Sequence, residues 1–586
     1  MKRFAWVITM LFLLLACRQE PLPLPEPEPE PQPEDNTEVS APAPGEYKLP
    51  LIETTDIHGY IVYTEGSTVH YRLAYVADKV KDTRGHGDRY DKDRLLLLDG
   101  GDLYQGASVS NLQDGKPVYV AMDVMEYDAV ALGNHEFDWG IESLIDPDAT
   151  LLDYEMGGSL KENKVPVVCA NLYRNGSRVS WTKDYVIVEK SAFNSSGASV
   201  KVKIGIIGFA VNYQSSIMAS KFSGKGFSIN DDFSVANRIA ASLEASGECD
   251  ATVLLIHGAA QSSAERLGSG SVIDLVLGGH SHQTQSGKTG GGMPYLQGGR
   301  YCEHYACSEL TFTVDSDGKV SFKSADNLRN ASVDSAHDLR TYAGQNSDNL
   351  DDEVVTVSDE AVAAVSEQLN DVIGYIDVPA TNTYIDGSGK RASNLSNWMC
   401  DILCRIGEAD VSFVNSGGIR TSIPLNGKSR RNIAVSNVYE IFPFCNTTYV
   451  YSITYSELMK VFEYAMTSGG NSLFSCMTGV DCRFSSNNKV ISLSKDGTVI
   501  YKNGSWTGDW ASREVILSVS EYLATTQRTD YYTSLSNPLI EWNSTQRLLY
   551  NSLVDNENAV LVLREEASES GGRLDIDTTA HFILAD

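Results

Sequence analysis

Side chains that suit metal ions recur in the first half of the chain, each beside an apolar run. Imidazole nitrogens suit zinc and other transition metals, whereas carboxylate and amide oxygens also admit manganese or magnesium. Seven ligands are too many for one tetrahedral ion, but two ions that share a bridging carboxylate would use them all. The candidate ligands are Asp56, His58, Asp102, Asn134, His257, His280 and His282.

The elements that must position these residues are buried strands. In a parallel sheet the carboxyl ends of the strands lie on one edge, where open α/β folds build their ligand sites. Five strand ends are therefore expected to converge on one spot. The predicted strands are the apolar runs at 48–52, 95–98, 129–132, 252–256 and 273–277.

The neighbouring patterns favour a layered α/β architecture with a largely buried sheet. Residues 201–210 predict another strand, and residues 231–246 have helical spacing, with Ile239 and Leu243 on one face. A polar connector follows, in which residues 358–371 predict a helix with Ser358 as its N-cap.

The ordered motifs resemble the calcineurin-like metallophosphoesterases, and specifically their 5'-nucleotidase and UDP-sugar hydrolase branch. In the first half, the motifs that carry this resemblance are DIHG at 56–59, GD at 101–102, GNHEFD at 133–138, LLIHG at 254–258 and GGHSH at 278–282. In the second half, the segments similar to that branch's substrate domain are KRASNLSN at 390–397, NSGGIR at 415–420, FPF at 442–444 and MTGVDCRFS at 477–485. The resemblance covers nearly the whole mature chain.

This resemblance implies an α/β (α+β) fold with two domains. A four-layer α/β/β/α metallophosphoesterase domain would precede an α/β substrate-binding domain. The predicted boundaries are 1–17 for a signal peptide, 18–45 for a Pro/Glu-rich linker, 46–338 for the metallophosphoesterase domain, 339–375 for a connector with a helix, and 376–586 for the substrate-binding domain.

The resemblance also implies roles for the metal-site residues. Asp56, His58 and His282 would hold one ion, while Asn134, His257 and His280 would hold the other. Asp102 would bridge the two ions. His135 would donate to a phosphoryl oxygen or to the charge of the transition state, and Asp138 would orient its ring. His282 stands where relatives often carry Gln, so the metal preference of this chain can differ from theirs.

In the second domain, the resemblance implies a set of substrate-binding residues. Arg391, Asn415 and Arg420 would grip phosphate and ribose, and Phe444 and Tyr522 would stack on a base. The chain departs from the family after Tyr522, where LATTQRTDYY replaces a GGDG-type turn.

The first residues resemble a bacterial lipoprotein signal. A basic start at 1–3 and an apolar core at 4–15 precede LLAC at 14–17, and the core is too short to span a bilayer as a helix. Cys17 would be lipidated and would anchor the protein to a membrane; an ordinary secreted protein is the alternative. Arg18 favours the outer membrane or the cell surface, with the periplasmic face also open. Residues 18–45 would form an extended acidic tether.

Charge and cysteine content limit the partners and the cross-links. The net charge of −30 argues against nucleic-acid polymers, because no basic stripe is present to release counterions, but it admits small phosphorylated ligands. Cys302 with Cys307, or Cys476 with Cys482, are close enough in sequence to form disulfides. Buried thiols are the equal alternative. The oligomeric state stays open.

The function expected from the resemblance is hydrolysis of phosphate monoesters, chiefly extracellular 5'-nucleotides. A hydroxide generated on two divalent ions, zinc, manganese or similar, would attack phosphorus. The alternatives within this class are 2',3'-cyclic nucleotides, UDP-sugars and non-nucleotide phosphate esters. A surface lipoprotein that binds its ligand with little turnover is an alternative of another class. His135 and Asp138 argue against it, because a protein that only binds needs no transition-state donor.

Overall fold

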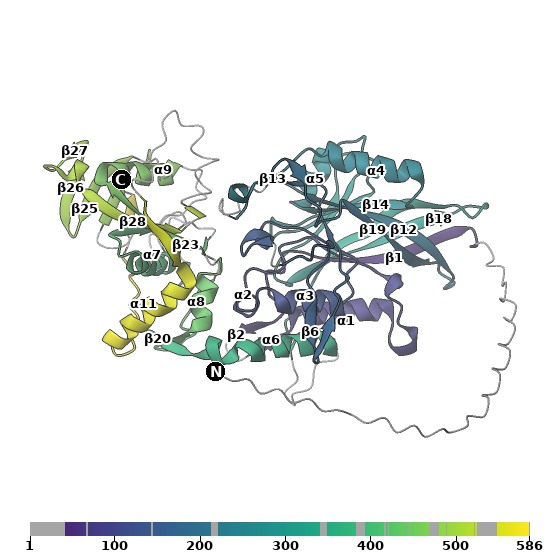
Figure 1. Ribbon diagram of the computed structural model, residues 1–586, viewed down its shortest axis with the longest axis horizontal. Coiled ribbons are helices and arrows are strands. Elements are labelled where there is room, and N and C mark those ends of the chain that lie inside the picture. Colours follow the sequence, from purple (N-terminus) through teal and green to yellow (C-terminus); the bar gives the residue numbers. More distant parts are fainter. Residues whose placement is uncertain are drawn as a thin grey trace, which may run out of the picture. The chain divides into compact units, whose positions relative to one another are not determined.

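The structure of the chain is a computed structural model (Figure 1). It describes residues 42–65, 68–141, 144–212, 221–339, 349–382, 393–414, 418–419, 421–444, 446–467, 480–487, 489–520, 522–523, 548–579 and 581–584. The predicted signal, Cys17 and residues 18–41 of the predicted tether lie outside these residues, whereas Gly45, the last residue of the predicted tether, begins the first strand, Gly45–Thr54. Among the helices that the structure describes, none is long and apolar enough to cross a membrane.

Two groups of largely parallel strands form the centre of the first half. In one group, β1 lies parallel to β4, β4 to β5 and β5 to β8, while β18 pairs antiparallel with β1 and with β19. The bounds are β1 Gly45–Thr54, β4 Leu96–Asp99, β5 Ala129–Ala131, β8 Val167–Val168, β18 His304–Val314 and β19 Val320–Ser332.

In the other group, β12, β14, β15 and β17 are parallel neighbours, and β11 and β16 lie antiparallel at its two sides. β11 also pairs with β1, where Phe193 lies opposite Lys48. These twelve strands therefore form one continuous hydrogen-bonded sheet. The bounds are β11 Tyr185–Phe193, β12 Ser199–Ala210, β14 Ala251–His257, β15 Leu275–Leu277, β16 Thr284–Lys288 and β17 Pro294–Gly298.

Alternating side chains place these strands between two helical layers. Leu97 of β4 packs in a core with α1 (Arg72–Arg84) and α3 (Lys116–Val124), whereas Leu98 packs in a core shared with Leu255 of β14. The next residue of β14, Ile256, packs with α4 (Ser234–Ser246) and α5 (Ala260–Leu267). Figure 1 shows α4 and α5 on one side of the strands and α1 and α3 on the other. The structure therefore has the predicted order of helix, strand, strand and helix layers.

The connector contains helix α6 (Asp352–Asn370), which begins earlier than predicted. The side chain of Asp351 caps it, accepting the N–H groups of Glu353 and Val354 at 3.0 Å each. Ser358 lies inside the helix and donates to the carbonyl of Val354, so the prediction of Ser358 as N-cap is wrong. An aspartate cap followed by acidic residues in the first turn favours the earlier start, because both complement the positive end of the helix dipole.

The second half contains mixed α/β structure with two hydrophobic cores. Its main sheet has the order β21–β28–β23–β29, and a second sheet has the order β27–β26–β25–β24–β30. The bounds are β20 Val372–Ile376, β21 Val411–Phe413, β22 Arg431–Ala434, β23 Thr447–Thr454, β24 Val480–Phe484, β25 Val490–Lys495, β26 Thr498–Lys502, β27 Ser505–Trp506, β28 Glu514–Ser520, β29 Leu548–Val554 and β30 Phe582–Leu584. The helices among the described residues of this half are α7 Asn394–Ile406, α8 Val435–Ile441, α9 Tyr455–Thr467 and α11 Asp555–Glu569.

Of the two cysteine pairs considered from the sequence, one can be assessed. Cys302 and Cys307 are buried free thiols, which excludes the disulfide alternative for this pair in the structure. Both pack in the core beside α1 and α3 as small apolar side chains. Cys476 of the other pair lies outside the described residues.

Candidate metal centre

The seven predicted ligands lie at or just after the carboxyl ends of β1, β4, β5, β14 and β15. Backbone hydrogen bonds hold the first two of these loops against each other. The N–H of Asp56 donates to the carbonyl of Gly101, and the N–H of His58 donates to the carbonyl of Asp102, each at 2.9 Å. The edge of the sheet thus brings together residues that are far apart in the chain.

Three of the ligands, Asp56, His58 and His282, form what we call the first group. Their ligand atoms lie within 4.8 Å of one another. Nε2 of His58 is 3.0 Å from Nε2 of His282, which is 3.4 Å from Oδ1 of Asp56. This spacing is short enough for one ion to contact all three side chains.

The second group consists of Asp102, His257 and His280, together with Asn134. Nε2 of His257 lies 3.2 Å from Oδ2 of Asp102. Oδ1 of Asn134 lies 2.8 Å from Nδ1 of His280 and 3.1 Å from Nε2 of His257. Oδ2 of Asp102 is also only 3.7 Å from Nε2 of His58. Asp102 therefore lies between the two groups, as a bridging carboxylate would.

The donor set fits divalent cations. Nδ1 of His58 and Nδ1 of His257 each lie 2.7 Å from a backbone carbonyl, that of Gln105 and that of Gly100. Because a carbonyl can only accept, Nδ1 carries the proton and the lone pair of Nε2 faces the ligand group. The Nε2 atoms of His58 and His282, 3.0 Å apart beside a buried carboxylate, suit a shared cation.

Burial and neighbouring charge act in opposite directions on the two carboxylates. Burial raises the pKa of Asp56 to about 7. Burial also acts to raise the pKa of Asp102, but the adjacent imidazoles of His257, His135 and His58 outweigh it and hold that pKa well below its usual range. Asp102 is therefore the carboxylate that stays ionised most readily, which suits a bridging position.

Five of the seven ligands adopt left-handed backbone conformations. Such φ values are uncommon for residues with a Cβ, although Asp, Asn and His tolerate them better than most. Unusual conformations of this kind gather at functional sites, where the surrounding fold holds them. The values are 51° for Asp56, 50° for His58, 60° for Asp102, 69° for His280 and 58° for His282.

His135 lies at the rim of the centre and is half-buried. Its backbone N–H donates to Oδ1 of Asp102 at 2.8 Å, and its ring nitrogen Nδ1 lies 2.7 Å from Oδ2 of Asp138. Burial raises the pKa of Asp138, while the charge of His135 and its hydrogen bond act to lower it. The Asp138 carboxylate thereby holds the His135 imidazole in one orientation.

Glu136 is a buried residue to which the sequence patterns assign no role. Its carboxylate accepts the backbone N–H groups of Asp102, Leu103 and Gly133 at 3.1, 2.7 and 2.7 Å. It thereby joins the loop after β4 to the loop after β5. The only sequence signal is that Glu136 is the one reactive side chain of GNHEFD at 133–138 to which the resemblance assigns no role.

The predicted substrate residues are only partly described. Phe444 stacks on His135 with ring centroids 5.5 Å apart and an interplanar angle of 30°. The preceding residue, Pro443, accepts hydrogen bonds from the side-chain amides of Gln105 at 2.7 Å and Asn111 at 2.9 Å. Tyr522 is half-buried. The remaining three predicted residues, Arg391, Asn415 and Arg420, lie outside the described residues.

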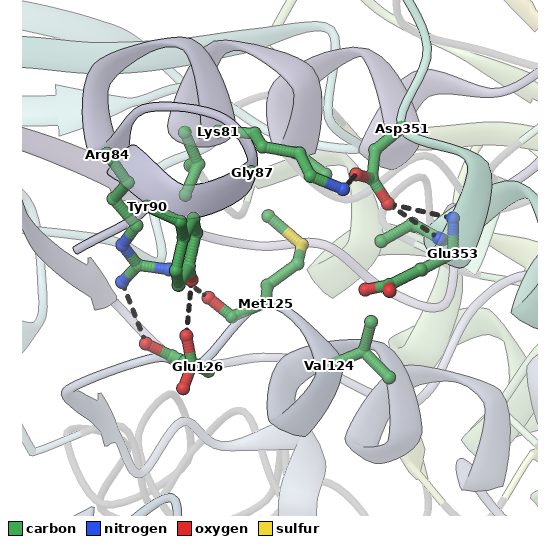
Figure 2. Close-up of a pocket in the computed structure, with 12 residues that line it drawn as sticks. Lys81, Arg84, Gly87, Tyr90, Val124, Met125, Glu126, Asp351 and Glu353 are labelled. Atoms are coloured by element: carbon green, nitrogen blue, oxygen red, sulfur yellow. Dashed lines mark hydrogen bonds and ion pairs between the residues drawn. The ribbon is translucent and has the colours of Figure 1, made fainter. Parts of the chain in front are cut away.

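A separate hollow of about 480 Å³ lies between α1, the end of α3 and the start of α6 (Figure 2). Several of its polar groups are bonded to one another. Lys81 pairs with Asp351 at 2.8 Å, Tyr90 donates to Glu126, and Arg84 donates to the carbonyls of Met125 and Glu126. The lining residues include no member of either metal group, so this hollow is not the candidate active site.

Comparisons with known proteins agree on one family. Residues 372–507 match the family model described as 5'-nucleotidase, C-terminal domain. The 5'-nucleotidase of Mus musculus is 25% identical over 467 residues, which cover 74% of each chain. A 2',3'-cyclic-nucleotide 2'-phosphodiesterase/3'-nucleotidase of Haemophilus influenzae is 28% identical over 256 residues, or 40% of this chain and 36% of that protein.

A solved structure also matches most of the chain. The 5'-nucleotidase precursor from Thermus thermophilus has a TM-score of 0.62 and 21% identity, and the match covers 92% of this chain and 99% of that one. This likeness concerns the fold. Together the comparisons confirm the resemblance to the 5'-nucleotidase branch of the metallophosphoesterases.

Proposed function

We propose that this relative of the 5'-nucleotidases is a dinuclear-metal phosphoesterase that hydrolyses phosphate monoesters, with 5'-nucleotides as its main substrates. The observation that carries the proposal is the pair of ligand groups that meet at Asp102, with His135 at their rim. Two divalent ions bound there would lower the pKa of a water molecule and neutralise charge on the phosphoryl oxygens.

The protein's own residues would orient and stabilise the phosphoryl group. Asp138 holds Nδ1 of His135, which directs the other edge of the imidazole to donate to a phosphoryl oxygen as charge develops in the transition state. The hydrogen bond from the backbone N–H of His135 to Asp102 fixes the position of the imidazole relative to the proposed bridging carboxylate. A donor positioned in this way costs no reorganisation during the reaction.

Nucleotide substrates are favoured by the surroundings of His135. The aromatic ring of Phe444 lies directly beside it, and such a face suits stacking with a base. Arg391, Asn415, Arg420 and Tyr522 complete the proposed substrate set. The family-model match at 372–507 and the similarity to the mouse 5'-nucleotidase support this choice.

A second candidate substrate class is the 2',3'-cyclic nucleotides. The similarity to the Haemophilus influenzae protein favours it, since that protein is named both for cyclic-nucleotide hydrolysis and for 3'-nucleotidase activity. A protein that only binds ligand is disfavoured by the pairing of His135 with Asp138, because binding alone needs no oriented donor for the transition state.

The ions would be zinc, manganese or a similar transition metal. Four of the seven ligands are imidazoles, which prefer such metals to magnesium or calcium. We also propose export and anchoring through a lipid on Cys17, at the outer membrane or cell surface, with residues 18–45 as the tether. Replacing Cys17 with Ala should release the protein into the soluble fraction if this anchor exists.

The central test is phosphate release by the purified protein, with zinc or manganese and after chelation. The substrates would be AMP, a 2',3'-cyclic nucleotide, UDP-glucose and an aryl phosphate. We expect metal-dependent release with AMP preferred. Release from the aryl phosphate alone would contradict the nucleotide assignment, and no release from any ester would contradict enzyme function. The variant His135→Asn serves as the inactive control.

A further inference from the structure

Tyr301 lies in the turn between β17 and β18 and contacts two imidazoles of the first group. The centroid of its ring is 5.6 Å from that of His58 and 5.6 Å from that of His282, at interplanar angles of 70° and 68°. The two imidazoles are 5.0 Å apart, at 67°. Each ring therefore meets the other two edge to face, a favourable aromatic geometry.

The backbone of Tyr301 reaches the third member of that group. Its N–H donates to the carbonyl of Asp56 at 2.8 Å, and its own carbonyl accepts from Nη1 of Arg72 at 3.2 Å. Tyr301 thus touches every residue of the first group through either its ring or its backbone.

The surroundings keep the ring in place. The ring of Tyr60 packs against it at 4.4 Å, and the guanidinium of Arg300 lies 4.8 Å from its centroid. Tyr301 has a φ of 53°, and Cys302 follows with a φ of 50°. Left-handed backbone is a true outlier for a bulky residue, so the fold maintains this turn at an energetic cost.

We infer that Tyr301 is a positioning residue of the first group and sets the affinity of that group for its ion separately from the second group. Its ring limits the rotation of the His58 and His282 imidazoles, and its N–H fixes the loop that carries Asp56. Groups that orient metal ligands in this way typically change metal affinity about 10- to 100-fold when they are removed. The inference rests on the dinuclear site proposed above.

The test is a metal titration of the full chain, with zinc or manganese, read by calorimetry and by metal content after gel filtration. Tyr301→Phe keeps the ring and should bind two ions like the wild type. Tyr301→Leu removes the ring and should bind one of its two ions about 10- to 100-fold more weakly, with the other unchanged. At metal concentrations that just saturate the wild type, this variant should retain one ion per chain.

A second variant separates the ring from the backbone. Tyr301→Gly relieves the left-handed strain and also removes the ring. It should therefore weaken the binding of one ion, as Tyr301→Leu does. Tyr185→Leu is the matched control, because it removes a partly exposed tyrosine from β11 and should keep both ions. Circular dichroism would confirm that each variant is folded.

Two results would overturn the inference. One is that Tyr301→Leu and Tyr301→Gly bind both ions with wild-type affinity. The other is that these variants lose affinity for both ions equally. A wild-type protein that binds no pair of ions would refute the dinuclear proposal itself, and the inference with it. If the wild type binds two ions, either of the first two results refutes this inference alone and leaves the dinuclear proposal standing.

Discussion

The side-chain amide of Gln105 donates a hydrogen bond of 2.7 Å to the backbone carbonyl of Pro443. Through its backbone carbonyl, Gln105 also accepts a hydrogen bond from Nδ1 of His58, a candidate metal ligand, at 2.7 Å. The residue after Pro443 is Phe444, whose ring stacks on His135. One buried glutamine therefore links a candidate metal ligand to the segment that carries a proposed substrate residue.

Replacing Gln105 with Met should lower kcat/KM for AMP about fivefold while leaving two ions bound. The loss of one buried hydrogen bond costs about 1 kcal/mol, whereas the bond to His58 involves only the backbone and is retained. Steady-state kinetics and metal content would check both parts. Gln113→Met is the matched control, because its amide donates to the carbonyls of Val109 and Ala361. Equal loss of activity in both variants would contradict a specific role for Gln105.

Replacing His135 with Asn should lower kcat about 100- to 1000-fold with metal content unchanged, since one preorganised donor to the transition state is lost. Asp138→Asn should also lower kcat, and the double variant should be no worse than His135→Asn, because Asp138 acts through the imidazole. Rates from the four proteins form a double-mutant cycle. Additive losses would show that Asp138 acts independently of His135.

Replacing Glu136 with Gln should lower the free energy of unfolding by about 1–3 kcal/mol and weaken metal binding. The carboxylate accepts three backbone N–H groups, and a neutral amide would turn its own NH₂ toward some of these donors. Urea unfolding with and without metal measures the effect. Glu155→Gln, on an exposed position of the hairpin strand Tyr154–Met156, is the control and should change little.

His581 should make stability depend on pH. Its Nδ1 lies 2.8 Å from Oδ1 of Asp481 and its Nε2 lies 2.6 Å from Oδ2 of Asp577. Burial acts to lower the pKa of His581, but the two carboxylates outweigh it and raise the pKa above 6.5. Burial acts to raise the pKa of Asp577, yet hydrogen bonds from His581 and Thr579 bring it to about 2.

The two shifts define a window of pH. The contribution of His581 is fully present below pH 6.5 and is lost as pH rises through its folded pKa. The contribution of Asp577 is present above pH 3.8 and is lost as pH falls toward about 2. His581→Gln should therefore destabilise most between about pH 4 and 6.5, by about 1.5–3 kcal/mol.

Urea unfolding of His581→Gln and the wild type at pH 5.5 and pH 9 measures the contribution of His581 to the free energy of unfolding. A chelator is present so that metal binding does not contribute. The difference between the two proteins should shrink at the higher pH. His86→Gln removes an exposed histidine paired with Asp82 and should show little difference at either pH. A difference for His581→Gln that is the same at both pH values would contradict the ionic origin.

The convergence of the candidate metal ligands could be predicted from the sequence because each of them follows directly from a local pattern. An apolar run marks a buried strand, and parallel strands present their carboxyl ends on one edge, so the ligands meet whatever the details of packing. The resemblance then divided them into the two groups that the structure brings together.

The roles of Gln105, Glu136 and Tyr301 could not be predicted in this way. Gln105 meets Pro443 across 338 residues of sequence, and hydrophobic periodicity indicates which face is buried but not which partner lies there. The start of α6 differs from the predicted start for a local reason. Ser358 is a plausible cap in the sequence, but Asp351 offers a carboxylate for the same role seven residues earlier, with two acidic residues after it.

The short segment from His280 to His282 gives one ligand to each group. His58 and His282 are 224 residues apart, so neither group is complete until nearly the whole first domain has been synthesised and its last site-bearing strand has docked. Nascent chains and truncated fragments that end before this segment would lack a full set of ligands for either ion. Metal acquisition should accordingly be a late and concerted event in folding, and a single proteolytic cut in this segment should release both ions together.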